Sequence, residues 1–254
     1  MALFKSGNPA LSEKRFTSTV IPDMLTAENA MTVKGTMQKF GFLLLMVLGS
    51  SFYSWKEFAD GGSVTGMIWT GAIGGLLLAI VISFKKEWSP FLAPLYALME
   101  GLFLGAISAM YNSAFAEKAP NIVINAVGLT LGVAVAMYLL YSFRIIKATE
   151  KFKSVIISAT VGIALFYLLV WVLRMFGFDN MPFLHEGSTF GIIFSLVVTG
   201  IAALNLILDF DMIEKGSEMG APKYMEWYGA FGLMVTIVWL YLEILRLLSK
   251  MSRR

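Results

Sequence analysis

Three acidic residues follow the sixth long apolar stretch of this chain, where it gives way to a polar segment. Asp209, Asp211 and Glu214 come directly after the uncharged residues 187–208. Charged side chains are costly within a membrane, so those found there usually mark an ion or proton pathway or a gate. We therefore expect these carboxylates at the mouth of such a pathway.

The spacing of the three acids limits how they can act together if they are helical. Asp211 and Glu214 then share a face, whereas Asp209 and Asp211 point about 200° apart. We expect one of Asp209 and Asp211 to face the interior while the other reaches water or headgroups. The alternative is an ordinary helix end, with the acids solvated in a loop beside Lys215.

Asn205 precedes Asp209 by one helical turn and lies on the same face. Amide and carboxylate oxygens are ligands that hard cations such as calcium prefer. Asp209 can also serve as a pH-dependent latch, because burial and nearby charges both shift the protonation of a carboxylate. We assign Asp209, with Asn205, as a tentative calcium site and gate.

Glu100 is an acid inside a long apolar stretch. Uncharged residues flank it for 12 positions before and 16 positions after. A glutamate in such a segment must pair, take up a proton or line water. We read Glu100 as a second tentative calcium or proton site, and the alternative is a neutral acid that hydrogen-bonds a neighbouring helix.

The last apolar stretch carries Thr236 and Glu243, seven residues apart and therefore on one helical face. Glu243 and Arg246 are three residues apart and can pair along the helix. Both Thr236 and Glu243 are candidate pathway residues, although a self-paired helix end explains them equally well. His185 is read as a solvated loop residue.

These residues sit in or beside seven apolar stretches. A bilayer core about 30 Å thick needs roughly 20 apolar residues as a helix. We therefore predict an all-α membrane protein with a polar tail at residues 1–37 and a seven-span membrane domain at residues 38–254. The stretches are 40–55, 61–84, 88–116, 119–143, 154–173, 187–208 and 227–248.

Composition supports the membrane prediction and excludes several functions. Only 15% of the residues are charged and 57% are hydrophobic, whereas soluble domains carry about 25% charged residues. The chain has no cysteine and one histidine, which excludes disulfides and histidine-rich metal sites. It shows no enzyme signature, and its basic residues are scattered, so we expect neither an enzyme nor a nucleic-acid partner.

Small residues recur four positions apart in several predicted spans. The pairs are Gly101 with Gly105 and Gly128 with Gly132, and Gly71, Gly74 and Gly75 form a further cluster. Such spacing lets helix backbones approach closely. We favour close packing at these glycines over flexible hinges.

Lysine and arginine positions predict the orientation. Thirteen of the 20 basic residues lie in segments on the side of the N-terminal tail, and three lie in the opposite loops. The N-terminus is therefore expected inside. The last four basic residues, Arg246 to Arg254, fall outside with seven full spans, whereas a re-entrant last segment would bring them inside.

Several of these features resemble the Bax inhibitor motif family, and within it the bacterial YccA-like branch. They are the pair Glu100–Gly101, the aspartate at the end of span six, and the closing Leu-Tyr-Leu-Glu-Ile-Leu-Arg-Leu-Leu. The segment Asp209 to Leu248, which contains Ala-Pro-Lys-Tyr-Met-Glu-Trp-Tyr-Gly-Ala-Phe, is the most specific part. The resemblance covers about residues 35–250.

The resemblance implies a bundle in which six helices surround the seventh, in the bacterial cytoplasmic (inner) membrane. It also implies a pH-sensitive calcium leak gated by aspartates in spans six and seven, with help from an arginine in span two. Asp209 falls at the first aspartate position. Thr236 occupies the second, and residues 61–84 contain no arginine, so this chain departs from the two-aspartate latch.

Two functions follow as hypotheses. The first is a passive calcium or cation pathway with Asp209 as the gate and Glu100 as an interior site. The second is a non-transporting regulator that binds a membrane protease or another stress-response membrane protein. The expected partners are the lipid bilayer and, in the second hypothesis, a membrane protease or another membrane protein. No cofactor is expected, and a monomer is favoured.

Overall fold

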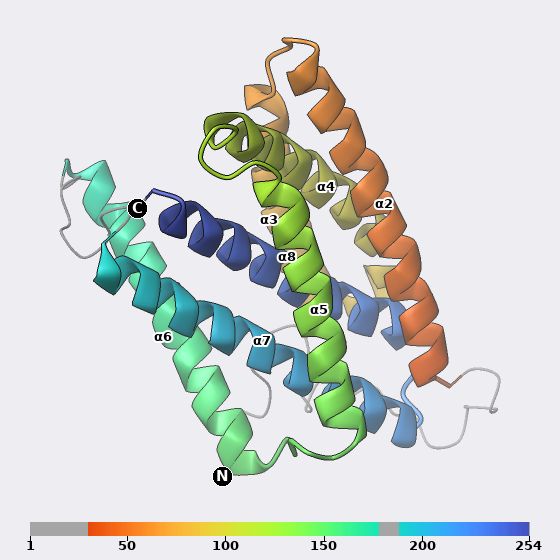
Figure 1. Ribbon diagram of the computed structural model, residues 1–254. Helices are drawn as coiled ribbons and strands as arrows, with labels where there is room; N and C mark the ends of the chain where they lie inside the picture. The colour runs from red at the N-terminus through yellow and green to blue at the C-terminus, as the bar shows by residue number, and fades with distance from the viewer. Residues whose placement is uncertain (1–29, 178–187, 254) are drawn as a thin grey trace. The chain divides into compact units, whose positions relative to one another are not determined.

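The computed structural model describes residues 30–177 and 188–253, which form helices joined by short connections (Figure 1). The described ranges hold seven α-helices, one short 3₁₀-helix and no named strand, with an isolated antiparallel bridge between Ala30 and Pro222. The elements are α2 (Val33–Ala59), α3 (Thr65–Phe84), η3 (Lys86–Trp88), α4 (Ser89–Ala114), α5 (Ile122–Ser142), α6 (Glu150–Met175), α7 (Thr189–Glu218) and α8 (Met225–Met251).

Six spans in the described chain are long and apolar enough to cross a membrane. They correspond to α3, η3 with α4, α5, α6, α7 and α8. The prediction of a helical membrane protein is therefore confirmed. The remaining helix, α2, occupies the position of the first expected span and has 27 residues. Its uncharged part covers only residues 40–55, between Lys39 and Lys56.

The end of α7 differs from the sequence prediction. We placed the end of the sixth apolar stretch at Leu208, but the helix continues to Glu218. Asp209, Asp211 and Glu214 are therefore helical residues, and the alternative of a solvated loop is wrong. Because the backbone hydrogen bonds of the helix continue past the apolar stretch, the directions of these three side chains are fixed by the helical repeat.

Contacts within the described chain divide it into two compact units. The α2–α4 unit contains residues 30–114 and 209–235, and the α5–α6 unit contains residues 115–208 and 236–253. The helices α7 and α8 each contribute one end to each unit. Functional residues on these two helices must therefore be assigned to units one by one.

In the α2–α4 unit, α4 packs against both α2 and α3 (Figure 1). A methyl group on Gly101 would collide with the carbonyl oxygen of Val47, and one on Gly105 would collide with the carbonyl oxygen of Ser51. Ser51 Oγ donates a hydrogen bond of 2.9 Å to the carbonyl oxygen of Gly101. The predicted close packing at these two glycines is confirmed.

The other glycines divide into two groups. A methyl group on Gly71 would lie 2.6 Å from the carbonyl oxygen of Met99, so α3 and α4 also approach closely. Around Gly128 and Gly132 of α5, no heavy atom of the described chain lies within 4 Å of such a methyl group. The prediction of close packing at this pair is wrong, because the spacing permits close approach without supplying a facing helix.

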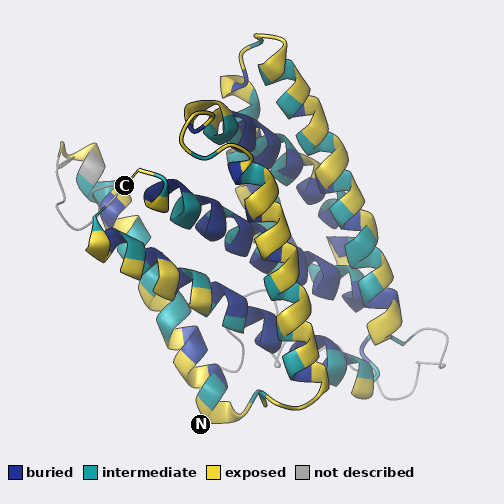
Figure 2. Ribbon diagram, viewed as in Figure 1, coloured by how far each residue is buried: buried dark blue, intermediate teal, exposed yellow. Residues whose placement is uncertain are grey.

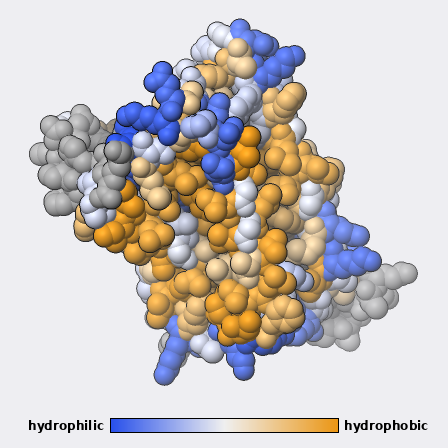
Figure 3. All heavy atoms as spheres, in the orientation of Figure 1, coloured by the Kyte–Doolittle hydropathy of each residue, from blue (hydrophilic) through white to orange (hydrophobic). Residues whose placement is uncertain are grey.

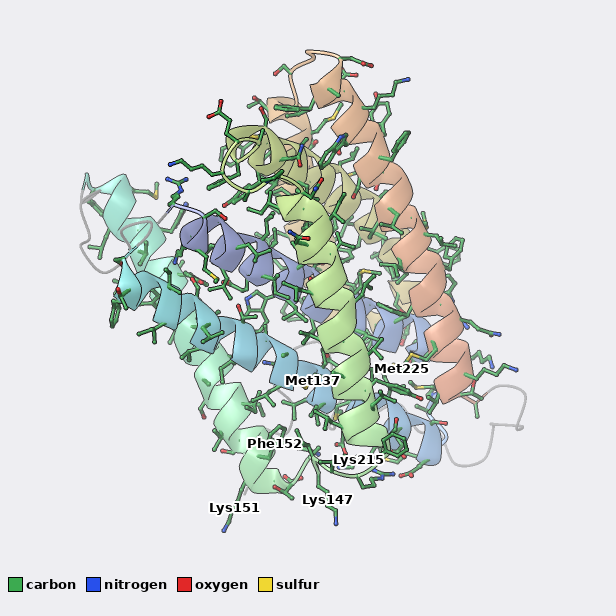
Figure 4. All side chains as sticks on the ribbon, in the orientation of Figure 1. Met137, Lys147, Lys151, Phe152, Lys215 and Met225 are labelled. Carbon is green, nitrogen blue, oxygen red and sulfur yellow. The ribbon has the colours of Figure 1, made fainter. Side chains whose placement is uncertain are left out.

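In the α5–α6 unit, a small apolar core joins α6 to α7. Ile156 and Ile157 are buried with Leu208, and Phe152 packs against them. At the start of α6 the side chains of Lys147 and Lys151 are exposed and extend away from the helix (Figure 4).

The helices differ in how much of them is buried. The most apolar stretch of α8 is 67% buried, against 17% in α3 and α6 (Figure 2). Large hydrophobic side chains cover the exposed faces of α3, α5 and α6. Figure 3 shows hydrophobic surface over the region of α5 and α6. Such faces suit lipid as the surrounding solvent, because water would make their exposure costly.

Candidate functional site

The acids at the end of α7 are more buried than the sequence suggested. Asp209 is 0% exposed and Asp211 is 7% exposed, while Glu214 is partly exposed. The expectation that either Asp209 or Asp211 reaches water or headgroups is wrong. Asp211 is instead partnered by Lys215 one turn later, with 3.0 Å between Nζ and Oδ2.

Asn205 lies one turn before Asp209 and is also buried. Its side-chain nitrogen donates to Thr160 Oγ1 of α6 at 2.9 Å and to the carbonyl oxygen of Ile201 at 2.8 Å. The amide therefore ties α7 to α6 within the α5–α6 unit. Since its nitrogen is used in this way, Asn205 has only its carbonyl oxygen to offer a cation.

Glu100 lies in the middle of α4 and is partly buried. Its side chain hydrogen-bonds Tyr96 one turn earlier. A methyl group on Gly75 of α3 would lie 3.1 Å from Glu100 Oε1, so the carboxylate rests against the backbone of α3. Tyr96 in turn packs edge-on against Phe231 of α8, with 4.9 Å between ring centroids.

The α2–α4 unit therefore contains Glu100 together with Asp209, Asp211 and Glu214. Among the described residues there is no group of three or more acidic, histidine or cysteine side chains placed to hold a metal ion. Tight calcium sites use six to eight oxygen ligands.

Glu243 of α8 belongs to the α5–α6 unit and is 1% exposed. Tyr167 of α6 donates to its carboxylate at 3.1 Å, and Trp239 Nε1 donates at 3.3 Å. Arg246 donates to the same carboxylate at 2.9 Å and to the Tyr167 hydroxyl at 2.7 Å. The predicted pairing of Glu243 with Arg246 is confirmed, within a network that also includes aromatic residues.

Thr236 is buried on α8, 3% exposed, and lies two helical turns before Glu243. The shared face that the seven-residue spacing predicted is therefore a buried face. Thr236 begins the part of α8 that belongs to the α5–α6 unit, whereas Asp209 belongs to the α2–α4 unit. The two positions at which the family resemblance expects aspartates thus fall in different units.

Sequence reasoning missed Glu226, which is 0% exposed in the first turn of α8. The backbone N–H and the hydroxyl of Thr32 both donate to its Oε1 at 2.9 Å. Lys39 forms an ion pair with Oε2, and Lys223 lies 3.1 Å from Oε1. Thr32 is 194 residues and Lys39 is 187 residues away in the sequence, so no local sequence pattern could have indicated the cluster.

A second polar contact was also missed, in the α5–α6 unit. Lys250 near the end of α8 is 6% exposed, and its Nζ donates to Ser195 Oγ at 2.8 Å and to the carbonyl oxygen of Gly191 at 3.2 Å. This lysine fastens the end of α8 to the start of α7. Ser195 is itself 1% exposed, so the pair is read as structural.

Two expectations fall outside the described residues. His185 lies in the range 178–187, and most of the N-terminal tail lies in the range 1–29. The helix α2 begins at Val33, within the residues 1–37 that the sequence analysis assigns to the tail. The tail and the first helix therefore meet at the residues that contact Glu226.

Comparison with known protein families matches residues 8–253 to the family described as Bax inhibitor 1 like. Searches among curated proteins and among solved structures found no match. The match extends over both units and over all seven described helices. The chain therefore belongs to the Bax inhibitor 1-like family and is a helical membrane protein.

Proposed function

We propose that this protein provides a passive, pH-sensitive pathway for cations, with calcium as the cargo. The observation that carries the proposal is Asp209, a fully buried carboxylate in the continuous helix α7, directly after an uncharged run of residues 187–208. A carboxylate at such a position is costly to bury and usually marks an ion pathway, a proton relay or a gate. Asp209 is the gate in this proposal.

Other buried acids support the choice of Glu100 by contrast. Asp211 pairs with Lys215, and Glu243 pairs with Arg246. Glu100 instead hydrogen-bonds Tyr96, a neutral partner, and lies against the backbone of α3. Its described partner is therefore not a base, and we assign Glu100 as the interior site.

Sparse coordination is suited to a leak pathway. Conduction requires a site that attracts the ion yet releases it, so a few oxygen ligands serve better than a closed cage. Protonation of a carboxylate removes its attraction for a cation, which gives the pathway its dependence on pH. Asn205 contributes one carbonyl oxygen near Asp209, while Asp211, Glu214, Thr236 and Glu243 stay secondary candidates.

The proposal includes a topology. We take α2 as a first span that completes seven, since 27 residues reach about 40 Å as a helix. The N-terminus lies inside a bacterial cytoplasmic membrane, as the basic residues favour, and the heavily buried α8 is the central helix. We further propose a monomer of the YccA-like branch without enzymatic activity.

Calcium flux into liposomes that contain the purified protein tests this function. We expect flux above that of empty liposomes, with a pH dependence that Asp209→Asn changes and Glu100→Gln also alters. Glu218→Gln is the matched control, since it removes an exposed carboxylate from the same helix. The proposal fails if wild type does not conduct at any pH, or if Asp209→Asn and Glu100→Gln both conduct as wild type.

The mixed-charge tail at residues 1–37 and the threonine at position 236, where the family resemblance expects an aspartate, favour an alternative function. In that alternative the protein is a non-transporting regulator, and its polar tail binds a membrane protease or another stress-response membrane protein. Deletion of residues 1–29 separates the two. A regulator that uses the tail loses its partner in co-purification, whereas an ion pathway still conducts.

A further inference from the structure

We propose that Glu226 is a latch that fastens the start of α2 to the hairpin of α7 and α8 and so keeps the acid-bearing end of α7 closed. Its effect on ion flow rests on the proposed function, but the latch itself does not. Glu226 is a positioning residue in this proposal, because it acts on Asp209 through the packing of α2 and α8 and does not bind the cargo ion itself.

The first part of the latch is the contact with α2. Thr32 is the N-cap of α2, and its hydroxyl accepts a hydrogen bond of 2.9 Å from the N–H of Gly35 while donating to Glu226. Lys39, further along α2, forms the ion pair with the other carboxylate oxygen. A methyl group on Gly35 would collide with the carboxyl group of Glu226. The fit leaves no room for a larger residue.

The second part is the contact with the loop between α7 and α8. The N–H of Met31 donates to the carbonyl oxygen of Ala221 at 2.6 Å, and Ala30 forms the isolated bridge with Pro222. Lys223 of the same loop reaches Glu226. One buried carboxylate therefore holds together the entry to α2, the loop and the first turn of α8.

The third part connects the latch to Asp209. A methyl group on Gly229 of α8 would lie 3.2 Å from Thr36 Cγ2, 3.3 Å from Ile213 Cγ1 and 3.5 Å from Met31 Cε. The first turn of α2, the end of α7 and the start of α8 thus meet at one point. Ile213 is one helical turn after Asp209 and on the same face. Separation at this point would uncover that face of α7.

The charge of the Glu226 carboxylate gives the latch two states, one in which its donors surround it and one in which the contact is open. A buried carboxylate is tolerated only while its donors surround it. Lys39 and Lys223 keep 21% and 50% of their side chains exposed, so both can return to water when the contact opens. In the latched state Asp209 is 0% exposed. Release should therefore favour states in which the end of α7 is open.

Hydrogen exchange of the full chain in liposomes tests the latch without measuring ion flow. We compare wild type with Glu226→Gln, which loses both ion pairs, and Gly35→Ala, which displaces the carboxylate without a change of charge. Exchange of the amides of residues 209–218 should rise about tenfold in both variants, as expected for loss of charge-assisted hydrogen bonds worth about 1.4 kcal/mol. Glu218→Gln and Gly41→Ala are the matched controls, and both should exchange as wild type.

A disulfide supplies the rescue that a merely destabilised protein would not show. The chain has no cysteine, so Ala30→Cys with Pro222→Cys places one pair across the isolated bridge. In the Glu226→Gln background, oxidation of this pair should return exchange in residues 209–218 to the wild-type rate, and reduction should raise it again. Unchanged exchange in both Glu226→Gln and Gly35→Ala, or a cross-link without rescue, overturns the latch.

Calcium flux in the same liposomes then decides whether the latch controls the pathway. Glu226→Gln should raise flux severalfold, and the oxidised disulfide should bring it back. Faster exchange without a change in flux, in a protein whose wild type conducts, overturns the coupling to the pathway. Absence of flux in wild type defeats the proposed function, while the exchange experiment still confirms or rejects the latch.

Discussion

The two ends of α8 each carry a buried glutamate, but they satisfy it in different ways. Glu226 in the α2–α4 unit binds Thr32 and Lys39 of α2 and Lys223 of the preceding loop. Glu243 in the α5–α6 unit binds Trp239 and Arg246 of its own helix and one residue, Tyr167, from another. Glu226 therefore joins segments that are distant in the sequence, whereas most partners of Glu243 lie in α8 itself.

This difference teaches that burial of an acid does not by itself identify an ion pathway. Both glutamates are almost completely buried, yet each has a basic partner that accounts for its charge. An acid becomes informative about function when its partners are considered as well as its depth. By that measure the charges of Glu226 and Glu243 are accounted for by bases, whereas the partner described for Glu100 is the neutral side chain of Tyr96.

The largest expected effect is the difference in stability between alanine variants of the two glutamates. Glu226→Ala should lower the free energy of unfolding by about 3 kcal/mol, because it removes a buried ion-paired group that joins three segments. Glu243→Ala should cost only about 1–2 kcal/mol, since Arg246 keeps its 2.7 Å hydrogen bond to the Tyr167 hydroxyl. Equilibrium unfolding in mixed micelles measures both. An equal or reversed order would contradict the comparison.

A second prediction concerns Gly35, which lies in the first turn of α2. Alanine is normally better than glycine inside a helix by up to about 1 kcal/mol. Gly35→Ala should nevertheless destabilise the protein by about 1–2 kcal/mol, as overpacking does, because its methyl group meets the Glu226 carboxyl group. Gly49→Ala in the same helix has open space around it and should be neutral or stabilising. The same unfolding measurement applies, and a gain from Gly35→Ala would show that the cluster is loosely packed.

Much of the fold was predictable because apolar length is a local property. The uncharged stretches located the helices, and lipid requires such segments to satisfy their own backbone groups. Helix ends were less predictable. α7 runs on to Glu218 through three acids, because a helix can leave the apolar region without ending. The prediction of close packing at Gly128 and Gly132 was wrong for a related reason, since the spacing of two glycines does not reveal whether another helix faces them.

The site was only partly predictable, for a similar reason. The pair Glu243 and Arg246 lies within one turn, and its spacing alone indicated the contact. The contact between Glu226 and Thr32 joins residues 194 positions apart, and no periodicity carries that information. The burial of Asp211 could not be predicted from its spacing, because the helical repeat gives the direction of a side chain relative to Asp209 but not what covers it.

A smaller effect is expected at the other end of α8. Tyr167→Phe removes a hydroxyl that accepts from Arg246 and donates to Glu243. Because Arg246 and Trp239 still contact the carboxylate, the cost should be about 0.5–1.5 kcal/mol. Exchange near Glu226 should not change. If Tyr167→Phe destabilised the protein as strongly as Glu226→Ala, the contact of Glu243 with α6 would matter as much as the contacts of Glu226 with α2, which contradicts the comparison.

The smallest effect should come from Lys223, and it tests which lysine holds Glu226. The side chain of Lys223 is 50% exposed and that of Lys39 is 21% exposed. Exposed ion pairs are screened by water and contribute about 0–1 kcal/mol, so Lys223→Gln should cost about 0.5 kcal/mol or less. Lys39→Gln should cost more, because Lys39 also lies over the ring of Trp227, 5.6 Å from its centroid. Unfolding of the two variants at low and high salt measures this, and only the Lys223→Gln difference should disappear in salt. A larger loss from Lys223→Gln would mean that the loop, rather than α2, is the main attachment of Glu226.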